Sequence, residues 1–137
     1  MYVSETKIRV RYVETDKMGI VHHSNYYIWF EASRDDFIQA AGFSYKDMEE
    51  EGIMMPLIET SCRYHQGAKY LDDVIVETSI KELTPIKVIF NYKVLRDSDK
   101  KLLATGNTTQ AFVDASFQIL NIKKKRPELW EKLRALL

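Results

Sequence analysis

The chain of 137 residues is 45% apolar and 29% charged, and its 20 basic side chains equal its 20 acidic ones in number. Length and composition are typical of a single globular domain, which we expect to span residues 1–137. A net charge of zero argues against nucleic acid or an anionic membrane as a partner, and no apolar run approaches the ~18 residues that a membrane span requires.

The N-terminal segment and the cysteine content indicate the cellular compartment of the protein. The N-terminal segment MYVSETKIRV has no signal-peptide core, and the single cysteine, Cys62, excludes an internal disulfide. Both features favour a reducing compartment, so we expect a cytoplasmic protein. Cys62 and His65 are three residues apart in a predicted strand, where such positions point to opposite faces. We therefore interpret Cys62 as a small buried residue rather than a nucleophile, and His65 as structural.

The first predicted element is a strand over residues 7–12. Ile8, Val10 and Tyr12 alternate there with three basic residues. This alternation is typical of a half-buried strand, and it places Tyr12 on the core side.

A loop separates this strand from a predicted helix over residues 25–41. Apolar and mostly aromatic side chains recur in the helix at spacings of three and four, and Gly42 is the expected stop. The first half of the helix is apolar almost all the way round, which indicates that the fold encloses it. Ser24 or Asn25 is the expected N-cap, because either side chain can accept a hydrogen bond from the first free backbone N–H groups.

The remainder of the chain is predicted to form mostly strands. A short helix begins at Ser44, with Asp47 three residues on, and ends near Glu51, while Pro127 opens a C-terminal helix. Strands that follow one another through short turns pair antiparallel, so the sequence predicts an α+β fold with one antiparallel sheet wrapped around a long central helix. The expected extended segments cover residues 56–70, 74–81, 87–95, 102–114 and 117–122.

The loop before the central helix concentrates polar chemistry. Its sequence, DKMGIVHHSNY at residues 16–26, places a carboxylate, a glycine, two histidines and an asparagine within a short stretch. A tight turn would need only the glycine and the asparagine. The other polar residues indicate a functional site.

This loop and its flanks resemble the signature of the hotdog-fold acyl-CoA thioesterases. Within that family the resemblance is to the 4-hydroxybenzoyl-CoA thioesterase group and its short-chain acyl-CoA thioesterase branch. The resemblance implies a hotdog fold, an acyl-CoA substrate, a homodimer or homotetramer, and neither a metal nor a bound cofactor. The matching positions are Tyr12, Asp16, Gly19, Ile20, Val21, His23, Asn25, Tyr26, Phe30, Glu31 and Arg34.

Four roles follow from the resemblance, position by position. Asp16 matches the catalytic carboxylate of the family, and His23 matches the position seven residues later, which is His or Tyr in different members. Tyr12 matches an active-site tyrosine of the short-chain branch, which would donate a hydrogen bond at the floor of the site. Asn25 matches the polar residue at the start of the central helix.

Elementary chemistry at the loop agrees with these roles. A helix N-terminus offers free N–H groups and a positive dipole end to the oxygen of a thioester carbonyl under attack. The loop brings the backbone from Val21 to Ser24 to this helix start, and Gly19 permits a tight bend beside the ligand. Asp16 would then act either as a nucleophile or as a base on water, and the sequence leaves both routes open.

Other charged residues receive simpler interpretations. His22 is a solvated or packing residue rather than a metal ligand, because adjacent histidines seldom bind one ion and no ligand cluster accompanies them. Glu31 stands on an otherwise apolar turn and is expected to pair with Arg34 or with a neighbouring subunit. The basic run at residues 123–126 is most simply a solvated surface.

The sequence thus predicts an enzyme that hydrolyses a short-chain or aromatic acyl-CoA to the free acid and coenzyme A. A different class, a non-catalytic protein that binds acyl-CoA or an acyl carrier, would use the same pocket without releasing thiol. A hotdog dehydratase is a further alternative, but it would need a histidine and an acid placed to remove a proton from carbon, which this loop does not suggest.

Overall fold

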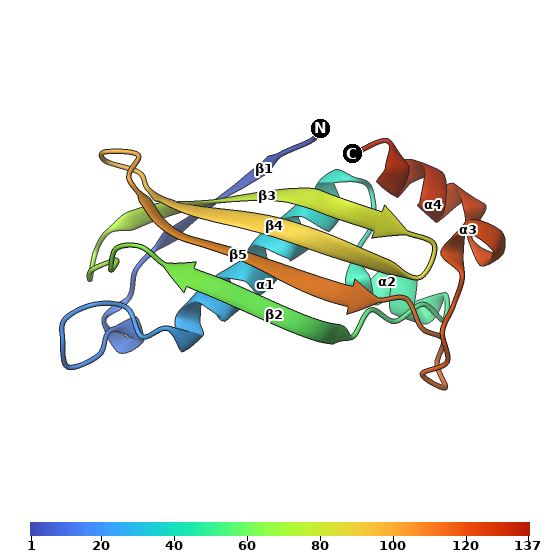
Figure 1. Cartoon of the computed structure of the whole chain (residues 1–137), viewed down its shortest axis with the longest axis horizontal. Helices are drawn as coiled ribbons and strands as arrows, with labels where there is room; N and C mark the ends of the chain where they lie inside the picture. Colours follow the sequence, from blue (N-terminus) through green and yellow to red (C-terminus); the bar gives the residue numbers. More distant parts are fainter.

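The computed structural model describes residues 1–137 and contains one antiparallel sheet in the order β1-β3-β4-β5-β2 (Figure 1). Helix α1 lies along one face of this sheet, and the short helices lie near its ends (Figure 1). The strands are β1 (Ser4–Arg9), β2 (Leu57–Tyr64), β3 (Asp73–Thr84), β4 (Lys87–Arg96) and β5 (Leu102–Ala111). The helices are α1 (Ser24–Ala40), α2 (Tyr45–Glu50), α3 (Ile122–Lys125), α4 (Pro127–Arg134) and a 3-10 turn, η1 (Tyr12–Glu14). None of the helices has both the length and the apolar character needed to cross a bilayer.

Aromatic packing fixes α1 against the sheet. The ring of Phe30 is fully buried and stacks on Tyr92 of β4, with centroids 4.2 Å apart. Gly106 of β5 makes room for this ring, because a Cβ there would lie 2.6 Å from Phe30 and 2.7 Å from the Ser61 carbonyl oxygen. Burial of one such ring stabilises the fold by about 1.5–3 kcal/mol. The enclosed aromatic helix predicted from the spacing is confirmed.

The alternation in the central strands is also confirmed. Val74, Val76, Thr78 and Ile80 of β3 are all buried, and the apolar set of β4 is buried in the same way. Two caps agree with the sequence as well. The Ser44 hydroxyl accepts a hydrogen bond from the Asp47 N–H at 3.0 Å at the start of α2, and Pro127 stands in the first turn of α4.

Three of the predicted segments that differ from the structure do so for an identifiable reason. The first strand ends at Arg9 rather than Tyr12, because the chain enters η1, which breaks the alternation. The strand after Pro56 ends at Tyr64 instead of residue 70. Residues 117–122 form no strand, since Phe117 has φ +60° and turns the chain, so that only Ile119 makes an isolated bridge.

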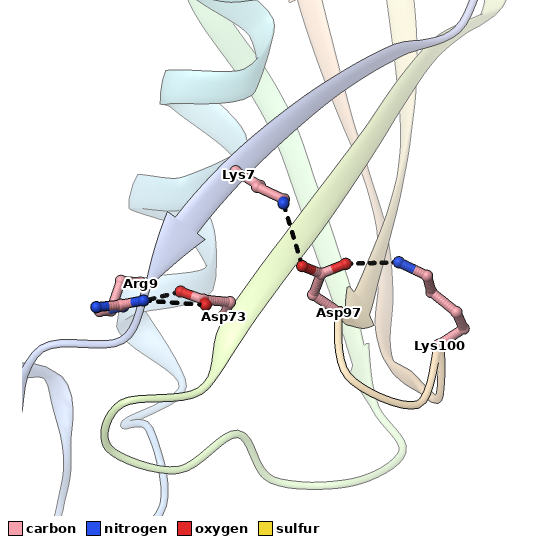
Figure 2. Close-up of polar contacts among 5 residues, drawn as sticks. All are labelled: Lys7, Arg9, Asp73, Asp97 and Lys100. Carbon is pink, nitrogen blue, oxygen red and sulfur yellow. Dashed lines mark hydrogen bonds and ion pairs between the residues drawn. The ribbon is translucent and has the colours of Figure 1, made fainter.

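Ion pairs join the β1 edge to its neighbours. Arg9 Nε lies 2.9 Å from Asp73 of β3, and Lys7 Nζ lies 3.2 Å from Asp97 in the turn after β4 (Figure 2). Lys100 contacts the other oxygen of Asp97 at 2.5 Å (Figure 2). These side chains are largely solvated, so the pairs orient the edge strand more than they stabilise it.

Candidate active site

A cavity of about 270 Å³ lies between the loop before α1, the start of that helix and the end of β2. Asp16, Val21 and His23, three of the predicted site residues, line it together. Tyr12, Gly19, Ser24 and Asn25 are not among its lining residues. The full lining consists of Asp16, Met18, Ile20, Val21, His23 and Tyr26 on one side, and of Tyr64, His65, Gln66 and Gly67 on the other.

Asp16 both shapes the loop and lines the cavity. Its Oδ1 accepts a hydrogen bond from the Met18 N–H at 2.8 Å, and its backbone N–H donates to the Ile20 carbonyl at 2.8 Å. Gly19 closes this turn with φ +82°, a backbone conformation that residues with a side chain rarely adopt. Its N–H donates to the Asp16 carbonyl. The second carboxylate oxygen, Oδ2, makes no hydrogen bond within the chain. One oxygen therefore holds the turn while the other is available for chemistry.

The N-cap of α1 is His23 rather than Ser24 or Asn25, which corrects the prediction, and the His22 ring supplies the capping acceptor that the His23 side chain does not. The Ser24 N–H donates to His22 Nδ1 at 3.3 Å, and the Asn25 N–H donates to the His22 carbonyl at 3.0 Å. The His22 side chain can cap because His23 already has helical φ and ψ, so that the helical turn begins one residue early. The rings of His22 and His23 stack with centroids 4.1 Å apart.

Backbone hydrogen bonds leave one amide of this segment free. The Val21 N–H donates to the Ala68 carbonyl at 2.9 Å, and the His22 N–H donates to the Glu14 carbonyl at 2.8 Å. The His23 N–H has no acceptor in the chain, although His23 lines the cavity. Of the predicted donors from Val21 to Ser24, the His23 N–H is therefore the one without an acceptor in the chain.

Ser24 and Asn25 stabilise the helix start instead of lining the cavity. The Ser24 hydroxyl lies 2.8 Å from His22 Nδ1. The Asn25 side-chain amide donates to the Glu14 carbonyl at 2.9 Å. Both side chains thus hold the segment that presents His23.

Tyr12 does not lie on the core side, contrary to the prediction from the alternation, and its role in the site stays a prediction. Its side chain is 76% exposed and packs edge-to-face against Tyr70, with ring centroids 5.6 Å apart. The physical reason is η1, which turns the chain immediately after the strand and points this ring outward.

Tyr64 is a site residue that the sequence analysis missed. Its hydroxyl donates to the His23 carbonyl at 3.3 Å, and its ring packs edge-to-face on Tyr26 at 5.1 Å. Burial and the nearby Cys62 raise the pKa of this phenol, so it remains a protonated donor. No local pattern could have revealed it, because Tyr64 reaches the helix start from β2, far away in the sequence.

The structure also shows the surroundings of Cys62 and His65, which the sequence analysis interpreted as structural residues. Cys62 is half-buried, and burial raises the pKa of its thiol, which disfavours the reactive thiolate. The His65 ring lies 3.3 Å from the Thr105 hydroxyl, a cross-strand contact.

A larger cavity of about 680 Å³ lies on the outer face of the sheet, but Asp16 and the α1 start do not line it.

The expected ion pair between Glu31 and Arg34 does not form within the chain. Glu31 is exposed, whereas Arg34 is only 6% exposed. Arg34 Nη1 donates to the Tyr92 hydroxyl at 3.3 Å and to the Thr108 hydroxyl at 3.5 Å, and no carboxylate of the chain pairs with it. Both residues lie on the same side of α1, where Arg34 reaches the buried hydroxyls of β4 and β5 while Glu31 remains at the surface.

Comparisons with known proteins point to one family. The model of the thioesterase-like superfamily matches residues 10–137. YneP of Bacillus subtilis, named provisionally as an acyl-CoA thioesterase, is 31% identical over 128 residues, which are 93% of each chain. The acyl-CoA thioesterase YbgC of Haemophilus influenzae is 28% identical over 108 residues, 78% of each chain. A solved DHNA-CoA thioesterase of Staphylococcus aureus is 32% identical with a TM-score of 0.93, covering 98% of this chain and 91% of that one.

Proposed function

Because the chain belongs to the thioesterase-like superfamily and has the expected hotdog fold, we propose that it hydrolyses an acyl-CoA thioester to a free acid and coenzyme A. The observation that carries this proposal is that His23, whose N–H is free at the start of an enclosed helix, lines the same cavity as Asp16. The cavity thus offers a donor for the carbonyl oxygen and an anion for the carbonyl carbon.

The donor stabilises the charge that develops during attack. As the carbonyl carbon becomes tetrahedral, its oxygen gains negative charge, which the His23 N–H and the positive end of the α1 dipole stabilise. Tyr64 supports this geometry by donating to the His23 carbonyl from β2. Coenzyme A departs as a thiolate, a good leaving group, so the cavity needs no strong acid beside the sulfur.

Asp16 supplies the attacking oxygen by one of two routes. In the first, Oδ2 attacks the carbonyl carbon, the thiolate leaves, and water then cleaves the mixed anhydride to regenerate the carboxylate. In the second, Asp16 removes a proton from a water molecule that attacks the thioester directly. A single turnover in ¹⁸O-labelled water, followed by mass spectrometry of the peptide that contains Asp16, tests for the anhydride. Label in Asp16 requires the anhydride route with attack of water at the aspartyl carbonyl. Label confined to the released acid arises from the water route or from attack of water at the acyl carbonyl of the anhydride.

The walls favour a short-chain or aromatic acyl group. The cavity is small, at about 270 Å³, and the rings of Tyr26 and Tyr64 form part of its lining. Offset or edge contacts between such rings and an aromatic acid are favourable by about 0.5–1.5 kcal/mol. The 32% identity to a solved DHNA-CoA thioesterase supports an acyl-CoA substrate.

Thiol release from a panel of acyl-CoAs, from acetyl to naphthoyl, tests the activity and ranks the acyl groups. Turnover of at least one member supports the proposal. Tight binding of a panel member without thiol release would instead identify a non-catalytic acyl-CoA binding protein.

We further propose that the protein acts as a homo-oligomer. Strand β2 pairs only with β5, and its outward residues include the apolar Leu57 and Ile58, the latter 61% exposed. A free apolar edge of this kind invites pairing with another chain. Sedimentation analysis tests the assembly, since Ile58→Lys should lower the mass of the particle while a monomeric wild type would contradict it.

A further inference from the structure

Glu14 is a buried carboxylate for which the proposed mechanism has no use. It lies in η1, two residues before Asp16, and is only 3% exposed. Its Oε1 accepts a hydrogen bond from the Arg11 N–H at 2.8 Å, and its Oε2 accepts one from the Trp29 indole N–H at 2.8 Å. Arg11 Nε lies 3.5 Å from Oε1 and provides the compensating charge. A buried charge persists only when paired and hydrogen-bonded in this way.

The backbone of the same residue holds the opposite side of the site. The Glu14 carbonyl accepts hydrogen bonds from the His22 N–H at 2.8 Å and from the Asn25 side-chain amide at 2.9 Å. Its side chain therefore binds the second turn of α1 through Trp29, while its carbonyl binds the segment that leads into the first turn. The segment that leads to Asp16 and the segment that contains His23 are therefore both held by Glu14.

We propose that Glu14 is a positioning residue that sets the separation between the Asp16 carboxylate and the free His23 N–H. The inference rests on the proposed thioesterase function, because it concerns the geometry of that reaction. A shift of about 1 Å between reacting groups costs roughly a hundredfold in rate. A residue that fixes both groups thus affects turnover without touching the substrate.

The carboxylate form is specifically required, because each oxygen faces an N–H donor. A glutamine has one acceptor oxygen and one NH₂ group, so Glu14→Gln must place an NH₂ donor against either Arg11 or Trp29. The side chain then moves away from one partner although its volume is unchanged. In Trp29→Phe one donor is absent, and a glutamine at position 14 fits without this clash.

Steady-state thiol release from the full chain tests the proposal. In Glu14→Gln we expect kcat to fall roughly tenfold to a hundredfold while KM changes little, since the binding surface is intact. The exposed Glu5→Gln serves as the matched control and should behave as the wild type. The loss caused by Glu14→Gln should be smaller in the Trp29→Phe background than in the wild-type background.

A second measurement does not depend on activity. Amide hydrogen exchange at His22 should accelerate in Glu14→Gln, because its acceptor is the Glu14 carbonyl, while amides of β4 should remain protected. An unchanged kcat, or a loss that disappears when the folded fraction is restored at lower temperature, would overturn the inference. If wild type cleaves no acyl-CoA, the proposed function fails, and exchange at His22 alone still decides whether Glu14 holds the loop.

Discussion

Replacement of Asp16 by two different residues separates its chemical role from its structural one. In the structure, Oδ1 holds the Met18 N–H and Oδ2 has no partner. The side-chain amide introduced by Asp16→Asn keeps an oxygen for Met18 and places its NH₂ where Oδ2 was unbonded, so the turn is retained. Asp16→Ala removes the acceptor and the turn loses one hydrogen bond, worth about 0.5–1.5 kcal/mol.

Both substitutions should abolish most of the activity, but only one should weaken the fold. We expect kcat for a good acyl-CoA substrate to fall at least about a hundredfold in both variants, the scale of losing a base or nucleophile. Thermal unfolding should be unchanged in Asp16→Asn, whereas Asp16→Ala should unfold a few degrees lower, as a loss of ~1 kcal/mol predicts for a domain of this size.

The assay combines thiol release with calorimetry on the same preparations. Lys17→Ala, an exposed neighbour with no bond to the turn, serves as the control and should match the wild type in both measurements. Wild-type turnover by Asp16→Asn would refute the role of the carboxylate. Equal loss of stability in the two Asp16 variants would refute the assignment of the turn to Oδ1 and of the chemistry to Oδ2.

Three further predictions concern the packing, the site and the surface. Gly106→Ala should lower the free energy of unfolding by about 1–3 kcal/mol, because the new methyl group would lie 2.6–2.7 Å from the Phe30 ring and the Ser61 carbonyl oxygen. Unchanged stability in a urea titration would show that α1 can move away from the sheet at no cost. Tyr64→Phe should lower kcat severalfold, because the hydrogen bond to the His23 carbonyl is lost, and should leave the fold intact. Steady-state kinetics measures this decrease, and a kcat equal to that of the wild type would contradict it. Lys100 and Lys7 lower the pKa of Asp97 below its ordinary value of 3.8. Any melting advantage of the wild type over Asp97→Asn is therefore full above that pH and declines as the pH falls through the lower, folded-state pKa. An advantage that shows no decline as the pH is lowered into the acid range would contradict the pairing.

Local patterns in the sequence determined the elements that pack against the core. The spacing of aromatic side chains predicted α1, and alternation predicted β3 and β4, because one buried face repeats at a fixed interval along a helix or a strand. The composition of the loop from Asp16 onward, together with its resemblance to a family signature, predicted where the chemistry lies. These features depend on neighbours in sequence, and the structure agrees with them on the fold.

Tertiary structure alone decided which groups face the cavity. The free amide belongs to His23 because Ala68 and Glu14, which come from other segments, occupy the amides before it. Tyr64 reaches the helix start from β2, and a 3-10 turn directs Tyr12 to solvent although the alternation placed it inside. Hydrogen bonds between distant segments form only after the sheet and the helix have packed, so periodicity cannot report them.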